Sequence, residues 1–309
     1  MKICMLGAGA MGGSIGGVLA ESGADVYLLD KWQEHVNTIK RHGLKIREDN
    51  SERIVKVRAA TDCRGIGPVD LVVIMVKCFH TKEAIEAALP IFGDKTTALS
   101  LQNGLGSENV IADILGNDRV LRGSTYVGGV LIGPGEVMIG RKRKPTYMGE
   151  LNGDITERVN RIGRLFDQAG LETIISDNIY GILWKKLLVN IAVGPLSAIT
   201  RLPHGGMSEV NDVIDCAIEA VMEAIAVARA NGVELSVNDP KDIWHEATDG
   251  LPYEHKASVL QDIEKGSKTE IDYINGIIVK LGEKLGIPTP VNKTLVAGVK
   301  GIEFGLKMP

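Results

Sequence analysis

The sequence predicts an α/β protein with an N-terminal doubly wound sheet and an all-helical C-terminal domain. A short apolar stretch at residues 2–6 leads into a glycine-rich turn, a helix-like run and a second apolar stretch at residues 25–30. Residues 70–76 are almost continuously apolar, as strands buried on both faces of a parallel sheet are. Beyond Asp177, strand-like patterns almost vanish and long helical patterns replace them. We therefore expect two domains, residues 1–176 and 177–309, as the length also suggests.

Composition narrows the classes of function. The chain of 309 residues is 44% hydrophobic and 24% charged, with a net charge of -4 and 4% aromatic residues, which argues against a nucleic-acid or anionic-membrane partner. Its scattered cysteines, without a CxxC pair, read as core thiols of a reducing compartment and predict no metal site; they are Cys4, Cys63, Cys78 and Cys216. No apolar run reaches membrane-spanning length, so we expect a cytoplasmic protein.

The glycine-rich turn matches G-x-G-x-x-G, the pattern that cradles the pyrophosphate of a dinucleotide. Its first glycine permits the tight turn, its second lets the backbone approach the pyrophosphate, and its third lets helix and strand pack closely. The helix that follows directs its N-terminus at the phosphates. Asp30 ends the second strand, where an acidic residue accepts from the adenine ribose hydroxyls. The predicted cofactor-binding residues of this turn are Gly7, Ala8, Gly9, Ala10, Met11 and Gly12. A glycine-rich turn without a ligand is the alternative.

Two further polar residues follow predicted strands at the same sheet edge, where such sheets bind ligands. Lys77 follows the strand at residues 70–76 and is either a cofactor contact or a solvated strand end. Asn103 follows the strand at residues 97–101. Asn-Gly is usually turn chemistry, but its place at this edge makes Asn103 a candidate contact for cofactor or substrate.

A helix of about three turns is predicted over residues 184–195, with Pro195 ending it. Lys186 and Asn190 are four residues apart and share a helix face among apolar neighbours. Burial disfavours the charged form of a lysine and so lowers its pKa, and a lowered pKa suits a proton donor. The alternative is that Lys185 and Lys186 both extend to solvent from an ordinary helix.

The remaining pattern completes the expected organisation. We expect a hairpin at residues 45–57, short strands between residues 124 and 148, a last strand at residues 172–175, and a solvated hairpin edge at the basic run 141–144. Expected helices span residues 32–42, 81–89, 155–169, 207–230 and 270–285.

The chain resembles the ketopantoate reductases (2-dehydropantoate 2-reductases) over essentially its full length. The resemblance rests on the glycine motif, Val76-Lys77, Gln102-Asn103-Gly104, Trp184-Lys185-Lys186 with Asn190, Ser258, and the segment 268–276. It implies a Rossmann domain, a helical C-terminal domain and a cleft between them. It also implies that Lys186 is the catalytic lysine and Glu270 its acidic partner, that Asn190 and Ser258 hold the 2-oxo acid, and that Asn103 and Lys77 line the cofactor cleft. Without the resemblance, Glu270 would be interpreted as a helix N-terminal acid and Ser258 as a surface or capping serine.

The chain departs from the family pattern at two places. Gly194 stands where a second Asn is common, which leaves the exact 2-oxo acid undetermined. Asp30-Lys31 stands where NADPH-using members tend to have a small residue and Arg. Asp30 would repel a 2'-phosphate and Lys31 would attract it, so we expect NADH or NADPH as cofactor, with NADH favoured.

The leading functional hypothesis is therefore reduction of ketopantoate to pantoate for pantothenate and coenzyme A synthesis. A related 2-hydroxyacid dehydrogenase of the D-mandelate type, acting on another branched or aromatic 2-oxo acid, is the runner-up. A non-catalytic dinucleotide-binding regulator is the alternative from another class, although a sensor needs neither Lys186 nor Glu270. The sequence determines neither the physiological direction nor the oligomeric state, and we keep a homodimer as a hypothesis.

Overall fold

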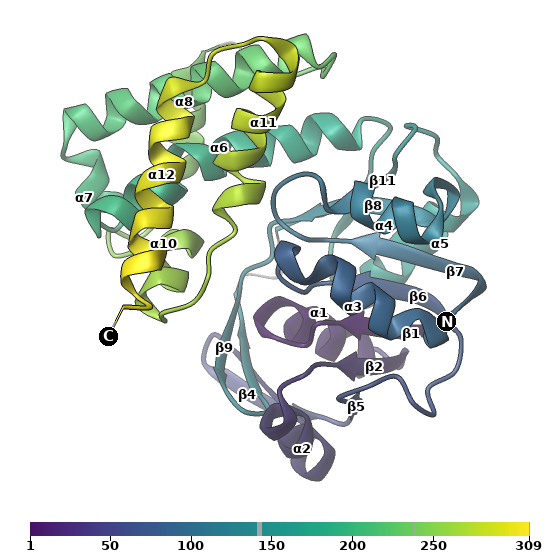
Figure 1. Ribbon diagram of the computed structural model, residues 1–309. Coiled ribbons are helices and arrows are strands. Elements are labelled where there is room, and N and C mark those ends of the chain that lie inside the picture. The colour runs from purple at the N-terminus through teal and green to yellow at the C-terminus, as the bar shows by residue number, and fades with distance from the viewer. Residues whose placement is uncertain (141–143, 238, 309) are drawn as a thin grey trace. The chain divides into compact units, whose positions relative to one another are not determined.

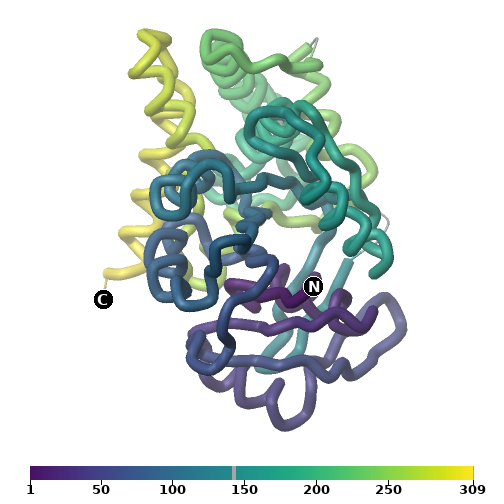
Figure 2. The backbone as a smooth tube through the Cα atoms, turned by 90° about the vertical axis from the view of Figure 1, so that its right-hand side faces the viewer, coloured from purple at the N-terminus to yellow at the C-terminus, as the bar shows by residue number. Residues whose placement is uncertain are grey.

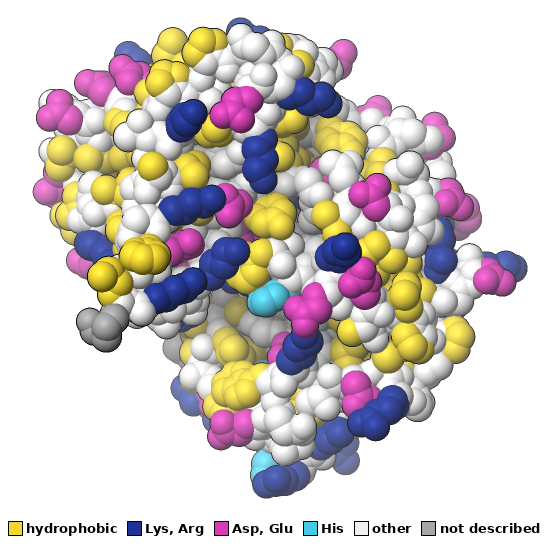
Figure 3. Space-filling view, viewed as in Figure 1, with side chains coloured by type: hydrophobic (Ala, Val, Ile, Leu, Met, Phe, Trp, Pro, Cys, Tyr) yellow, Lys and Arg dark blue, Asp and Glu magenta, His cyan; other side chains and the backbone are white. Residues whose placement is uncertain are grey.

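The computed structural model describes residues 1–140, 144–237 and 239–308, and its chain forms two compact units (Figure 1). The first unit comprises Met1–Gln102 and Ser107–Ile179, and the second comprises Asn103–Gly106 and Tyr180–Pro309. Most of the basic run, residues 141–143, lies outside the described residues. On the surface displayed in Figure 3, acidic and basic side chains are interspersed, as expected for a chain with a small net charge.

The first unit is built on an eight-stranded sheet in the order β12-β11-β8-β7-β6-β1-β2-β5. The N-terminal strand lies inside this sheet, because it pairs in parallel with both β2 and β6 (Figure 2). All the pairings are parallel except that between β11 and β8, which is antiparallel. The strands are β1 (Lys2–Leu6), β2 (Asp25–Leu29), β5 (Arg58–Ala60), β6 (Val69–Ile74), β7 (Phe92–Ser100), β8 (Val120–Thr125), β11 (Thr146–Glu150) and β12 (Thr173–Ile175).

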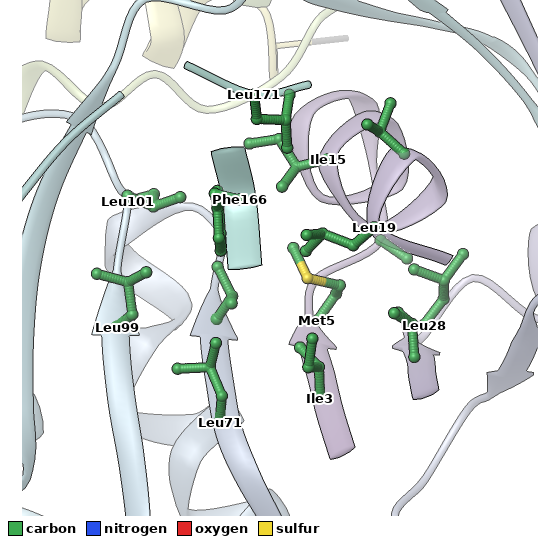
Figure 4. Close-up of a cluster of buried hydrophobic side chains, with 14 of the residues drawn as sticks. Ile3, Met5, Ile15, Leu19, Leu28, Leu71, Leu99, Leu101, Phe166 and Leu171 are labelled. Carbon is green, nitrogen blue, oxygen red and sulfur yellow. The ribbon is translucent and has the colours of Figure 1, made fainter. Parts of the chain in front are cut away.

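Helices cover both faces of this sheet, as expected because alternate side chains of β1 are buried on opposite faces. Ile3 and Met5 belong to one buried cluster with residues of α1 (Ala10–Glu21) and α5 (Glu157–Gln168), which Figure 4 shows gathered between sheet and helices. Cys4 and Leu6 belong to a second cluster with residues of α3 (Thr81–Ala88) and α4 (Ser107–Leu115). The predicted doubly wound α/β fold is confirmed. The four cysteines are free thiols, three of them buried.

A four-stranded sheet, β4-β3-β10-β9, also belongs to the first unit. Its hairpin of β3 (Leu44–Glu48) and β4 (Ser51–Val55) is the one the sequence predicts. β10 (Glu136–Ile139) pairs with β3 and with β9 (Gly129–Gly133). Residues of β3 and β10 enter the same cluster as α1, so this sheet packs near the glycine-rich turn.

The second unit is helical, as predicted. In it, α11 packs against both α8 and α12 (Figure 1). Its helices are α6 (Ile179–Thr200), α7 (His204–Ser208), α8 (Asn211–Ala230), α9 (Pro240–Thr248), α10 (Ser258–Glu264), α11 (Asn275–Leu285) and α12 (Pro290–Gly305), with the 3-10 helix η4 (Ile271–Tyr273) before α11.

Three predicted helix boundaries are wrong. The helix expected to end at Pro195 runs on to Thr200, because Leu196 and Ala198 are buried and tertiary packing offsets the backbone hydrogen bond that proline removes. The run 207–230 is interrupted between α7 and α8. The run 270–285 is broken at Ile274, whose φ of -107° and ψ of -95° are not helical.

The longer α6 also corrects the expectation that no apolar run reaches membrane-spanning length. Within the described residues, α6 is the one helix long and apolar enough to cross a membrane, with a mean hydropathy of 1.4 in its best window. About two thirds of that window (67%) is buried inside the protein, and core helices pass the same test, so this is weak support for a membrane span.

Candidate functional site: a dinucleotide loop and a lysine-bearing helix

The glycine-rich turn has the geometry that a pyrophosphate requires. Gly7 has a φ of +96°, and a Cβ on Gly12 would lie 1.8 Å from the Gly7 carbonyl oxygen, so neither position accepts a side chain. A Cβ on Gly9, in contrast, would have no atom within 4 Å. Gly9 is the N-cap of α1 and offers no side-chain cap to the first turn of that helix. The open space over Gly9 and the helix N-terminus therefore fit a phosphate group.

The backbone of Ala8 is hydrogen-bonded through both its N–H and its carbonyl. Its N–H donates to Asp30 Oδ2 at 2.8 Å, while the other oxygen of Asp30 accepts from Trp32 N at 2.9 Å. Its carbonyl lies 3.0 Å from Nε2 of His35, and His35 Nδ1 accepts from the Gly135 N–H at 2.9 Å. With Nδ1 accepting, Nε2 carries the proton and donates to Ala8.

His35 is a residue that the sequence prediction missed. Its side chain is fully buried, and burial lowers its pKa, although Asp30 and two backbone hydrogen bonds act in the opposite direction. The ring is therefore neutral near pH 7 and fixes one tautomer between the glycine loop and the β9–β10 turn. A histidine on the apolar side of the predicted helix 32–42 is the signal that could have found it.

Lys31 forms an ion pair with Glu83 of α3, and both side chains are largely exposed. This pair places a carboxylate on Lys31, the residue that follows Asp30. The pairing of Lys31 was not predicted from the sequence, because Glu83 lies 52 residues further along the chain.

Lys77 and Asn103 follow β6 and β7, but not directly. β6 ends at Ile74, and half-buried Lys77 is the N-cap of a 3-10 helix, η1 (Cys78–His80). Gln102, buried before Asn103, donates to the Val76 carbonyl at 2.7 Å and to Thr81 Oγ1 at 2.8 Å. Gln102 thus joins the segments that follow β6 and β7, a positioning role that the sequence analysis missed.

A buried ion pair is connected to Gln102 by hydrogen bonds through Ser100. Arg122 Nε and Glu108 Oε2 lie 3.3 Å apart, with side chains 0% and 4% exposed. Arg122 also donates to Ser100 Oγ at 2.7 Å, and Ser100 Oγ donates to Gln102 Oε1 at 3.1 Å. A charge pair this deeply buried needs such additional hydrogen bonds.

The Asn103–Gly106 loop belongs to the second unit, where it meets the segment that carries Glu270. Gly104 has a φ of +75°, and a Cβ on it would lie 2.3 Å from the Tyr273 carbonyl oxygen. Leu105 N donates to the same oxygen at 3.2 Å. Glu270 is buried and is the N-cap of η4, so the structure brings the segments of Asn103 and Glu270 together.

Both lysines of α6 are half-buried. Lys185 Nζ lies 3.0 Å from Glu246 Oε2 of α9, in a partly exposed ion pair. Lys186 and Asn190 are half-buried, while Leu187, Leu188 and Ile191 are fully buried. The helix thus presents Lys186 and Asn190 on one half-buried stripe, as the spacing predicts.

Ser258 and Gly194 are linked through their neighbours. Ser258 is exposed and is the first residue of α10, followed by buried Val259. A Cβ on Gly194 would lie 3.0 Å from Val259 Cγ2, which shows that α10 begins beside α6, one turn beyond Asn190. All five residues predicted for catalysis and substrate, Lys186, Glu270, Asn190, Ser258 and Asn103, thus belong to the second unit. Among the described residues, no group of three or more His, Cys, Asp or Glu side chains could hold a metal ion.

The doubly wound sheet, the dinucleotide loop and the lysine-bearing helical unit define the class as a nicotinamide-dependent oxidoreductase. The sequence profile "Ketopantoate reductase PanE/ApbA" matches residues 3–153, and the profile "Ketopantoate reductase PanE/ApbA C terminal" matches residues 178–303. The chain belongs to the ketopantoate reductase family.

Individual relatives agree with this assignment. The chain is 36% identical to the 2-dehydropantoate 2-reductase of Pyrococcus horikoshii, over 98% of both chains, and 30% identical to that of Aquifex aeolicus, over 99% of both. A PanE/ApbA family ketopantoate reductase from Ralstonia eutropha has a similar structure, with a TM-score of 0.92, 34% identity and full coverage of both chains. D-mandelate dehydrogenase, solved with NADH and anilino(oxo)acetate, superposes over both full chains with a TM-score of 0.93 at 28% identity.

Proposed function

We propose that this protein is a 2-dehydropantoate 2-reductase, which reduces the ketone of ketopantoate to the hydroxyl of pantoate. The observation that carries the proposal is the half-buried Lys186–Asn190 stripe on α6, together with buried Glu270 in the same unit. The activity is that of the curated relatives, which match along the whole chain.

The reduced nicotinamide, when bound, supplies the hydride to the ketone carbon. Negative charge then develops on the former carbonyl oxygen, and a positioned ammonium stabilises this charge and delivers a proton. We assign this role to Lys186. Asn190 and Ser258 hold the substrate through its polar groups, and Glu270 orients the lysine and balances its charge.

The same residues assign cofactor binding and catalysis to different parts of the chain. We propose that residues 1–176 bind the dinucleotide through residues 7–12, Asp30 and Lys77, and that residues 177–309 carry catalysis, with Asn103 contributing from the loop after β7. The ordinary free thiols and the relatives' biosynthetic activity support a cytoplasmic enzyme.

For the cofactor, we propose NADH rather than NADPH. Both carboxylate oxygens of Asp30 accept backbone N–H groups, so this charge is fixed in place and cannot turn away from a 2'-phosphate. A like-charge contact in a partly desolvated site costs several kcal/mol.

A second candidate is a 2-hydroxyacid dehydrogenase of the D-mandelate type. Gly194 packed on Val259 gives this part of the second unit an apolar wall where the family commonly has an amide. Such a wall favours branched or aromatic 2-oxo acids without a further hydroxyl.

One experiment separates these functions. Purified protein is incubated with ketopantoate, benzoylformate and other 2-oxo acids, each with NADH and with NADPH, and loss of the reduced cofactor is followed by absorbance. The highest kcat/KM with ketopantoate supports the leading proposal, and the highest with benzoylformate supports the second. Dinucleotide binding without turnover of any 2-oxo acid would contradict both and indicate a regulator.

A further inference from the structure

We propose that Glu83 is a specificity-determining residue that withholds Lys31 from the 2'-phosphate of NADPH and so favours NADH. This inference rests on the proposed function, in which the adenine ribose lies beside Asp30. It adds a residue from α3, outside the glycine motif and outside β2, the strand that Asp30 follows.

The first step is the pairing itself. Lys31 Nζ contacts Glu83 Oε1 directly, so the lysine next to Asp30 already has a carboxylate partner. The hydrogen bond from Lys31, followed by its charge, lowers the pKa of Glu83, which therefore stays ionised at neutral pH. His80 Nδ1 lies 3.8 Å from the other Glu83 oxygen, too far for a strong hydrogen bond.

The second step is the position of Glu83 on α3. It lies in the first turn of that helix, where the helix dipole favours a negative charge. The carboxylate is therefore stabilised in place by two independent effects.

The third step is a count of charges. Asp30, Lys31 and Glu83 together contribute two carboxylates and one ammonium, so a 2'-phosphate would meet a net negative charge. Without Glu83 the same region would be neutral, with Lys31 released. Because the Lys31–Glu83 pair is exposed, with side chains 71% and 64% accessible, water and salt screen the effect and it is modest.

The test is a titration of purified protein with NADH and with NADPH, each followed by the fluorescence of the reduced nicotinamide. Glu83→Gln should tighten NADPH binding by about threefold to fivefold, as expected for removing one screened charge, and should leave NADH binding within about twofold. Glu86→Gln is the matched control, because Glu86 lies on the same helix, is exposed, and also faces a lysine, Lys82, at 4.0 Å. It should change neither affinity.

A double-mutant cycle tests whether the gain acts through Lys31. In a Lys31→Gln background, Glu83→Gln should recover less NADPH affinity than it does in the wild-type background. Equal effects of Glu83→Gln on the two dinucleotides, or the same effect from Glu86→Gln, would overturn the assignment of Glu83 while leaving the reductase proposal intact. If the wild-type protein bound neither dinucleotide, the proposed function and this inference would both be wrong.

Discussion

Gly9→Ala should abolish most dinucleotide binding without destabilising the protein. Gly9 has an extended backbone with a φ of -64°, outside the left-handed region that favours glycine, and an added Cβ would have no protein atom within 4 Å. The space that the methyl group would enter is therefore not needed by the fold. It is the space over the N-terminus of α1 where the proposed pyrophosphate must approach.

The size of the effect follows from the hydrogen bonds that the pyrophosphate would lose. A hydrogen bond to a charged group contributes about 1.5–3 kcal/mol. Displacing the phosphate from one or two backbone N–H groups at this turn would therefore cost about 3 kcal/mol, or roughly a hundredfold in dissociation constant. Gly12→Ala is the contrasting variant, since its Cβ would lie 1.8 Å from the Gly7 carbonyl oxygen and α1 would have to move. Overpacking of this kind typically costs 1–3 kcal/mol of stability or more, about 2–12 °C in Tm.

Two measurements on each variant distinguish these effects. Calorimetric titration with NADH gives the dissociation constant, and thermal unfolding without cofactor gives Tm. We expect Gly9→Ala to keep the wild-type Tm within about 1 °C and to lose affinity, and Gly12→Ala to lose Tm. Unchanged affinity in Gly9→Ala would refute the assignment of the pyrophosphate to this turn, and a large loss of Tm in Gly9→Ala would refute the claim that its methyl group enters open space.

Three other predictions follow from the second unit. Lys186→Ala should lower kcat by about a hundredfold or more, whereas Lys185→Ala should retain turnover; the reverse result in steady-state assays would contradict the assignment of the helix face. Burial, with a smaller effect of a neighbouring histidine, lowers the pKa of His204 to about 4 from 6.5. The neutral ring therefore contributes roughly 3 kcal/mol of stability above pH 6.5, which is lost as the pH falls to about 4. His204→Leu should flatten the dependence of Tm on pH in this range. An unaltered slope would argue against this role of His204. Gly194→Asn should lower Tm because its Cβ would lie 3.0 Å from Val259 Cγ2. Adding Val259→Ala should recover part of the lost Tm. Additive losses of Tm would mean that the two side chains do not compete for space.

The first β-α-β segment could be predicted accurately because its signals are local. The strand, the glycine turn, the helix and the acidic residue all lie within the first 30 residues, and each constrains its neighbours through backbone geometry. The prediction was less accurate where tertiary packing decides. Pro195 would end an isolated helix, but buried Leu196 and Ala198 carry α6 onward, and Ile274 breaks a run whose composition is helical throughout.

Polar groups that act through distant partners were the least predictable. His35 is an ordinary helix residue until the β9–β10 turn brings Gly135, 100 residues away, to its Nδ1 atom. Gln102 precedes the predicted Asn-Gly turn after β7, yet its amide donates to Val76 and Thr81 in the segment that follows β6. Neither role has a sequence pattern, because the partner in each case is a backbone atom or a small hydroxyl that any sequence could supply.

The same reasoning explains why the two halves of the proposed site needed different arguments. The cofactor residues 7–12 and 30 are close in sequence, and backbone geometry alone assigns their chemistry. The candidates for catalysis and substrate binding include Lys186, Ser258 and Glu270, which are spread over 85 positions and lie on three separate elements of the second unit. Packing relates Lys186 to Ser258 through Val259 against Gly194, and it relates Glu270 to the Asn103 loop through Tyr273 against Gly104. A lysine on an apolar helix has no distinctive chemistry alone, so the role of Lys186 depends on residues that the fold, rather than the local sequence, assembles in the same unit.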